Sequence, residues 1–239
     1  MADELPLLHT HVEGLDRALG GGIPKGSTIL VAGTPGTMKT SLVLWMMREN
    51  ARETGAKSLY VSLEQSADGL RSGAARMGMG ELKESQVYIL DLAQLRRGME
   101  RSETSKDWVA ILLEIIKEAV NSTGYQLLAV DSLEALYALT EMQNPRREMF
   151  HFLTALKEFD LTTFAIAETS FGENRLAKWG EDFLADGILQ LRQVEVGETD
   201  VQLRLRCVKM RWMNHDHNAL ALNHDGERFF VTHVISKKK

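Results

Sequence analysis

The sequence predicts an α/β fold in which helices flank a mostly parallel central sheet and antiparallel hairpins follow near the C-terminus. Between residues 28 and 210, short apolar runs alternate with longer helical patterns, which is typical of a parallel sheet with helices on both faces. A glycine-rich segment joins the first of these runs to the first long helical pattern. After residue 186, apolar and polar residues alternate with a period of two, which is typical of antiparallel strands.

The expected elements of the α/β region follow one another in a regular order. Trp108, Ile111, Leu112 and Ile115 recur at three- and four-residue steps, so their segment predicts a helix with one buried face. Strands are expected at residues 28–33, 58–64, 87–92, 127–131 and 162–168. Helices are expected at about residues 40–54, 66–77, 107–122 and 145–159.

The C-terminal part has a different texture. GILQLRQVEV, DVQLRLRCVKM and NALALN alternate in period two with breaks at Gly197 and a polar stretch, so we expect antiparallel hairpins appended to the edge of the sheet. The longest expected loop covers residues 169–182, and long loops in compact domains tend to be functional. No linker or repeat divides the chain, so we expect one domain over residues 1–239 with a basic tail at about 236–239.

Composition narrows the classes of protein. The formal net charge is −5 and the pI about 5.8, which does not favour a surface built to bind nucleic acid. No apolar run approaches the ~18 residues of a membrane span, and the acidic start does not resemble a signal peptide. We therefore expect a cytoplasmic protein without membrane contact. Cys207 is the single cysteine, so it cannot form an intramolecular disulfide and is expected to pack in a strand.

The segment from Gly33 to Ser41 has the pattern of a phosphate-binding loop between a strand and a helix. In such a loop, backbone N–H groups at the helix N-terminus bind phosphate, a lysine adds positive charge, and the next hydroxyl can ligate Mg²⁺. An ordinary glycine-rich turn is the alternative interpretation. The candidate ligands for nucleotide phosphates are Thr34, Pro35, Gly36, Thr37, Met38, Lys39, Thr40 and Ser41.

Met38 departs from the loop pattern, which has glycine at this position. We expect the loop to accommodate it, because Gly36 remains free to adopt positive φ and position 38 adjoins the helix start. Methionine is unbranched and flexible, so we expect its side chain to turn toward the core.

Carboxylates end three of the expected parallel strands. Asp131 closes LLAVD and is a candidate Mg²⁺ ligand together with Thr40, while Glu64 and Glu168 close two other strands. Ligands of open parallel sheets bind at the carboxyl edge of the strands. We therefore expect Lys39, Glu64, Asp131 and Glu168 to converge there, although each strand-end acid taken alone could be ordinary surface.

Several segments together carry a resemblance to a known family. HVEGLDRALGGGIPKGSTILVAGTPGTMKTSL, VSLEQS, LLAVDS, GEDFLADGILQLR and KMRWMNH resemble the KaiC-like branch of the RecA and RadA superfamily of ATPases, over about residues 11–232. The resemblance implies a RecA-like P-loop NTPase fold that binds ATP or ADP with Mg²⁺. It also implies that Glu64 polarises the attacking water as general base, although Gln65 stands where many relatives have a second acid.

The same resemblance implies a site shared between subunits. Lys209-Met210-Arg211 matches a Lys-x-Arg motif that reaches the γ-phosphate of a neighbouring subunit, and His215 matches a position near that nucleotide. Lys209 and Arg211 are therefore candidate catalytic cations. Such a site needs head-to-tail contacts between copies, and a hexameric homo-oligomeric ring is the first expectation. In relatives that phosphorylate themselves, the modified hydroxyls lie in the stretch that matches residues 179–186, and here this stretch contains no Ser or Thr, so the resemblance does not imply autokinase activity.

Three functions remain open at this point. The first is an ATP hydrolase whose ring drives or regulates a partner, which the sequence does not identify. The second is an ATP-binding switch with little hydrolysis, which Met38 and Gln65 favour. The third is a recombination-associated paralogue acting on DNA, which the mixed charges of residues 169–182 do not favour.

Overall fold

The computed structural model describes residues 5–99, 107–140, 142–170 and 175–234, so the basic tail expected at 236–239 lies outside the described residues. The strands are β1 Leu7–Leu8, β2 Ile23–Pro24, β3 Thr28–Gly33, β4 Ser58–Ser62, β5 Val87–Asp91, β6 Leu127–Asp131, β7 Thr162–Glu168, β8 Gly187–Val196, β9 Asp200–Met210, β10 Leu220–His224 and β11 Phe229–His233. The helices are α1 Leu15–Ala18, α2 Lys39–Thr54, α3 Ala67–Arg76, α4 Leu92–Met99, α5 Trp108–Thr123, α6 Leu133–Leu139, α7 Pro145–Lys157 and α8 Glu181–Leu184.

Within the described ranges, nine strands form one sheet in the order β11-β10-β9-β8-β3-β7-β6-β4-β5. The five expected strands between residues 28 and 168 are present and pair in parallel. The expected antiparallel hairpins are confirmed, since β8 pairs antiparallel with β9, β9 with β10, and β10 with β11. β8 extends the parallel set, because it pairs in parallel with β3 as well as antiparallel with β9.

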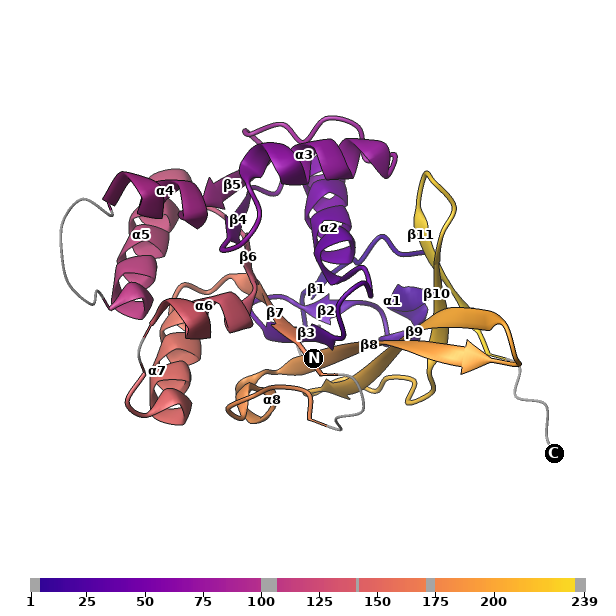
Figure 1. Ribbon diagram of the computed structural model, residues 1–239. Coiled ribbons are helices and arrows are strands. Elements are labelled where there is room, and N and C mark those ends of the chain that lie inside the picture. The colour runs from indigo at the N-terminus through magenta and orange to yellow at the C-terminus, as the bar shows by residue number, and fades with distance from the viewer. Residues whose placement is uncertain (1–4, 100–106, 141, 171–174, 235–239) are drawn as a thin grey trace.

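Helices cover both faces of this sheet (Figure 1), with α2 and α3 on one side and α5, α6 and α7 on the other. The alternation of side chains along each strand produces the two layers. In β3, Ile29 and Val31 belong to the cluster on the α2 side, whereas Leu30 and Ala32 belong to the cluster on the α5 side. The continuous apolar runs of the sequence therefore reflect strands buried on both faces.

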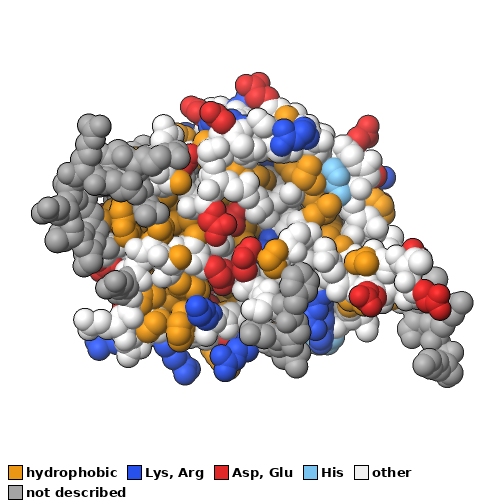
Figure 2. Space-filling model, viewed as in Figure 1, with side chains coloured by type: hydrophobic (Ala, Val, Ile, Leu, Met, Phe, Trp, Pro, Cys, Tyr) orange, Lys and Arg blue, Asp and Glu red, His pale blue; other side chains and the backbone are white. Residues whose placement is uncertain are grey.

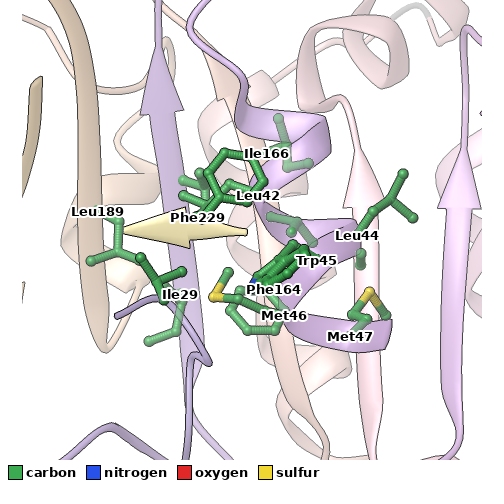
Figure 3. Close-up of a cluster of buried hydrophobic side chains, with 14 of the residues drawn as sticks. Ile29, Leu42, Leu44, Trp45, Met46, Met47, Phe164, Ile166, Leu189 and Phe229 are labelled. Carbon is green, nitrogen blue, oxygen red and sulfur yellow. The ribbon is translucent and has the colours of Figure 1, made fainter. Parts of the chain in front are cut away.

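Helix α2 is packed against the middle of the sheet through its apolar side (Figure 3). Leu42 and Met46 lie among side chains of β3 and β7, including Phe164. The Trp45 ring meets Phe229 of β11 edge-on at 5.7 Å between ring centroids, which joins this helix to the C-terminal hairpin. Rings in that geometry stabilise a core beyond their buried area. The position of the α2 N-terminus is fixed by this packing.

Local signals set the helix ends. The side chains of Ser66, Asp107 and Asn144 accept hydrogen bonds from backbone N–H groups at the starts of α3, α5 and α7, as expected of N-cap residues. Helix α2 ends at Gly55 and α5 at Gly124, both in the left-handed conformation that glycine adopts without strain. These capping residues explain why the helix boundaries expected from the sequence lie close to those of the structure.

The single cysteine and the lengths of the described helices agree with the expectations from the sequence. Cys207 is buried in β9, and burial raises the pKa of its thiol to about 12, so its expected packing role is confirmed. No helix among the described residues is long and apolar enough to cross a membrane.

The two-layer core predicts a contrast between two phenylalanines. Phe164 of β7 is fully buried, whereas Phe183 of α8 is 70% exposed. Phe164→Ala is expected to lower the free energy of unfolding by about 3–5 kcal/mol through lost burial and a residual cavity, and Phe183→Ala by no more than about 0.5 kcal/mol. Urea unfolding of both variants measures the difference, and equal losses would contradict the assignment of the core.

Candidate functional site

The segment between β3 and α2 forms a tight loop that only particular residues permit. Gly36 has φ 79° and Met38 has φ 62°, so both lie in the left-handed region. A Cβ on Gly33 would lie 2.6 Å from the Leu191 carbonyl oxygen and 2.7 Å from the Thr37 hydroxyl oxygen. That hydroxyl donates to the Thr34 carbonyl at 2.7 Å, which closes the loop on itself. The glycine of the motif at position 33 is therefore required by packing.

The N-terminus of α2 is open to an anion. Neither a side-chain cap nor an acidic residue occupies the first turn of this 16-residue helix, unlike the starts of α3, α5 and α7. The first helical hydrogen bond runs from Leu42 N to the Met38 carbonyl at 2.9 Å. The N–H groups before Leu42 and the positive end of the helix dipole are therefore available to phosphate oxygens.

Lys39 lies inside the loop and is only 7% exposed. Its ammonium donates to the carbonyls of Gly33 at 2.9 Å and Thr34 at 3.0 Å, and it lies 3.9 Å from a Glu168 carboxylate oxygen. Burial lowers the pKa of Lys39, although Glu168 and Asp131 act in the opposite sense. This cation is held at the loop by backbone oxygens.

Met38 differs from the expectation in one respect. The loop accommodates it as the N-cap of α2 with Gly36 at positive φ, but the Met38 side chain is 41% exposed. The expected rotation toward the core is therefore wrong. Position 38 itself adopts the left-handed conformation, which costs a residue with a side chain about 1–2 kcal/mol.

Asp131 and Thr40 are in direct contact. The Thr40 hydroxyl donates to Asp131 Oδ2 at 2.7 Å, and the buried Tyr60 hydroxyl donates to the same oxygen. Burial and the Asp131 charge raise the pKa of Tyr60 well above its usual range, so this phenol remains a donor. A hydroxyl and a carboxylate oxygen held side by side fit Mg²⁺, which prefers oxygen ligands and retains water.

Glu64 follows the end of β4, two residues past Ser62, and is exposed to solvent. Its carboxylate accepts a hydrogen bond from the Ser132 hydroxyl at 3.1 Å, which ties it to the residue after Asp131. Lys39, Glu64, Asp131 and Glu168 are thus brought to one edge of the sheet, as the strand-end pattern predicts. Figure 2 shows acidic side chains gathered in the middle of this face, near the positions of β6 and β7 in Figure 1.

Glu134 in the first turn of α6 is an acidic residue of this edge that the sequence patterns do not predict. Its Oε2 accepts from Glu168 N at 2.7 Å, whereas its Oε1 is buried without a hydrogen-bond partner among the described residues. Burial raises the pKa of Glu134 to about 7, and the charges of Glu168 and Glu181 act in the same sense. A glutamate one turn after a strand-end Asp-Ser carries no motif, so only the fold reveals it.

A cavity of about 580 Å³ adjoins the loop at this edge. Glu181 lies fully buried beside it and accepts from the Tyr137 hydroxyl and from Trp179 N. The described residues that line the cavity are Pro35, Glu134, Glu168, Thr169, Ser170, Arg175, Ala177 and Lys178.

Lys209 and Arg211 lie near the start of β3, at the opposite end of the central strands from the phosphate-type loop. Asp186 accepts from Thr28 N at the start of β3 and from Arg211 Nη1 at 2.8 Å, whereas the phosphate-type loop follows the end of β3. Lys209 donates to three carbonyls around the end of α8, the shortest distance being 2.6 Å to Ala185 O. At about 3.3 Å per residue, β3 separates these cations from the loop of the same chain by roughly 16 Å.

The remaining candidates at that edge have different surroundings. The Met210 side chain is buried in the core cluster of the α2 side, so only its backbone is offered to a ligand. The His215 ring packs edge-on against His217 at 4.6 Å, and its Nε2 is buried without a partner among the described residues. Burial and the charge of Arg211 lower the pKa of Lys209.

The fold and the loop define a RecA-like P-loop ATPase. A family model described as the KaiC ATPase matches residues 8–225, and the chain belongs to this family. It is 27% identical over 230 residues to circadian clock oscillator protein KaiC 1 of Synechocystis, which covers 93% of this chain and 44% of that protein. It is 30% identical over 196 residues to KaiC of Rippkaea orientalis, covering 80% of this chain and 37% of that protein.

The chain therefore spans less than half the length of these curated relatives. The fold is also that of a KaiC-like protein from the archaeon Pyrococcus horikoshii, whose crystal structure superposes with a TM-score of 0.82 at 24% identity. That match covers 95% of this chain and 99% of the other.

The raised pKa of Glu134 predicts that the free energy of unfolding decreases as pH rises. Between the ordinary pKa of 4.5 and the folded value of about 7, the folded protein keeps a proton that the unfolded chain loses, so stability falls as pH rises. Glu134→Gln removes this dependence. Its free energy of unfolding relative to wild type is expected to rise by up to about 3 kcal/mol between about pH 4.5 and about pH 8.

Urea unfolding at both pH values measures this rise. Glu118→Gln, at an exposed position of α5, is the matched control. A relative stability of Glu134→Gln that does not change with pH would contradict the environment assigned to Glu134.

Proposed function

We propose that this chain hydrolyses ATP with Mg²⁺ at interfaces between its own copies, each site combining the loop of one copy with Lys209 and Arg211 of the next. The observation that carries the proposal is the separation of these cations from the loop of their own chain. Lys39 already supplies the cation of the loop, and Lys209 and Arg211 lie at the other end of β3. Cations at that edge can reach phosphate only in another copy.

The chain's own groups have separate tasks in this proposal. The N–H groups of the loop and Lys39 bind the β- and γ-phosphates, and the Thr40 and Asp131 oxygens hold Mg²⁺, which offsets phosphate charge when bound. Glu64 accepts a proton from a water directed at the γ-phosphate. Its exposed carboxylate is oriented by the Ser132 hydroxyl at 3.1 Å. Lys209 and Arg211 of the neighbour stabilise charge that develops on the transferred phosphoryl group.

Head-to-tail contacts of this kind generate a closed ring or a filament, and we propose a hexameric ring that drives or regulates a protein partner in the cytoplasm. Autokinase activity is not part of the proposal, since residues 179–186 offer no hydroxyl acceptor. A nucleotide-binding switch with little hydrolysis would use the same binding residues. The rate of ATP turnover distinguishes it from the proposed hydrolase. DNA binding receives no support from the net charge of −5.

Removal of the proposed base tests the hydrolytic step. Glu64→Gln is expected to slow steady-state ATP turnover by at least ~10²-fold, because the amide cannot accept the proton. Affinity for Mg·ATP, measured by calorimetric titration, is expected to stay within about threefold, because Glu64 does not bind phosphate. Lys39→Ala is the binding control and is expected to abolish the calorimetric signal. Unchanged turnover in Glu64→Gln would show that Glu64 is not the base.

Mixing two inactive variants tests the shared site. Arg211→Ala subunits keep an intact Glu64, and Glu64→Gln subunits keep an intact Arg211. Each variant alone is expected to be inactive, whereas a mixture contains interfaces where the intact residues face each other. ATP turnover of the mixture, measured after subunit exchange is verified with labelled protein, is expected to recover to a substantial fraction of wild type.

A verified mixed assembly without turnover would overturn the shared-site mechanism. Full turnover by a strictly monomeric form would overturn it as well. Wild-type activity per subunit is expected to rise with protein concentration until the assembly is saturated.

A further inference from the structure

Two exposed apolar side chains stand beside the two halves of the proposed site. Trp212 follows Arg211 directly and is 93% exposed, and Met38 precedes Lys39 and is 41% exposed. Both adopt the left-handed backbone conformation, with φ 64° at Trp212 and φ 62° at Met38. Bulky residues rarely occupy this region, where glycine is free of strain. The sequence thus places a large apolar side chain at two strained, solvated positions.

Exposure to solvent does not explain why a large apolar residue stands at either of these two positions. A tryptophan left in water contributes no burial, yet its body offers a larger apolar contact area than most other side chains. Trp45 and Trp108 of the same chain are buried, at 6% and 9% exposure. Trp212 is therefore an outlier among the described tryptophans, and tryptophan is enriched among residues that anchor protein interfaces.

The fold excludes a contact between Met38 and Trp212 within one chain. Met38 lies in the loop after the end of β3, whereas Arg211 N donates to Asp186 O at 2.8 Å, and Asp186 pairs with Thr28 at the start of β3. The two apolar residues thus belong to opposite edges of one sheet. A contact between different surfaces of two copies is head-to-tail, which is also the geometry of the proposed function.

We propose that Trp212 of one copy packs against Met38 of the next and so aligns Arg211 with the neighbouring phosphate loop. This contact rests on the proposed function. Met38 is adjacent to the loop lysine and Trp212 is adjacent to the cation delivered in trans, so bringing Arg211 to phosphate brings the two apolar side chains to the same place. A methionine sulfur beside an aromatic ring is a favourable pair. In this proposal, the surface that covers each exposed side chain belongs to a second copy of this chain.

Local hydrogen bonds fix the backbone at Trp212 relative to Lys209 and Arg211. Arg211 is fixed through Asp186 and through Phe183 O at 3.1 Å, and Lys209 is fixed by carbonyls within and just after α8. An indole one residue further on moves with this rigid group. Trp212 is a positioning residue in this proposal, because it acts on phosphate only through Arg211.

Tryptophan emission and assembly measure the contact directly. With a non-hydrolysable ATP analogue and Mg²⁺, the emission difference between wild type and Trp212→Phe isolates Trp212. It is expected to shift to the blue and to lose acrylamide quenching as sedimentation velocity shows assembly. Met38→Ala is expected to assemble more weakly and to leave Trp212 more accessible to acrylamide.

A double-mutant cycle identifies the pair. Met38→Ala and Trp212→Ala keep a Cβ at both strained positions, so they remove contact without relieving the backbone. Each is expected to weaken assembly, and the double variant to weaken it less than the product of the two, with a coupling between about twofold and tenfold in the association constant. Val201→Ala, at a 62% exposed position of β9, is the control and is expected to couple with neither.

Assembly with Trp212 still solvated, or additive effects of Met38→Ala and Trp212→Ala, would overturn the contact. The mixing of Arg211→Ala with Glu64→Gln subunits keeps Met38 and Trp212 intact and tests the shared site alone. Recovery of turnover in that mixture, together with additive effects of Met38→Ala and Trp212→Ala, would show that the shared site stands and that this contact does not. A chain that does not assemble at any concentration would overturn both proposals.

Discussion

The in-register parallel pairing of the central strands is the constraint on which the site depends. Gly33 pairs with Glu168 between β3 and β7, and Ser62 pairs with Asp131 between β4 and β6. Because every one of these strands runs in the same direction, their carboxyl ends form one row. A shift of one residue would turn each strand-end side chain to the opposite face. The buried apolar residues that alternate along the strands hold the register, so the core and the site are specified together.

A cluster centred on Asp186 organises the other edge of the sheet. Burial alone would raise the pKa of Asp186, but hydrogen bonds from Thr28 N, Lys157 and Arg211 outweigh it and lower the pKa. One carboxylate therefore connects the start of β3, the end of α7 and the segment after β9. An unpaired carboxylate at this depth would be unfavourable, so the cations are held in place as a group. Loop and cations are thus fixed at opposite ends of the same strand.

The sequence was most informative where a physical requirement is local. The strands 28–33, 127–131 and 162–168 were predicted with their observed bounds, because their apolar runs end at glycine, aspartate or glutamate. The strand expected at 58–64 ends at Ser62. Leu63 N still donates to the Asp131 carbonyl at 2.8 Å, but Glu64 lies beyond the strand, where its carboxylate accepts from the Ser132 hydroxyl. Periodicity cannot show where this strand ends, because the residues after Ser62 have the same composition as the strand.

The sequence was less informative where a property comes from the whole fold. Glu134 has no motif, and its raised pKa results from burial between α6 and β7. The side-chain direction of Met38 depends on the left-handed backbone that the loop imposes on it, and preference for a core position could not reveal that. The parallel pairing of β8 with β3 also escaped the alternating pattern, because one strand can pair in parallel on one side and antiparallel on the other.

Because β3 is rigid, the loop at its end and the cations at its start hold fixed positions relative to each other. A strand buried on both faces and hydrogen-bonded on both sides transmits position along its length with little deformation. In a head-to-tail assembly, the cations that each copy offers are therefore set at a fixed distance from the loop that the same copy presents to its other neighbour. Alignment at one interface then constrains the next one around the assembly. A residue that fixes the approach of Arg211, as proposed for Trp212, would act on every site of such an assembly through this strand.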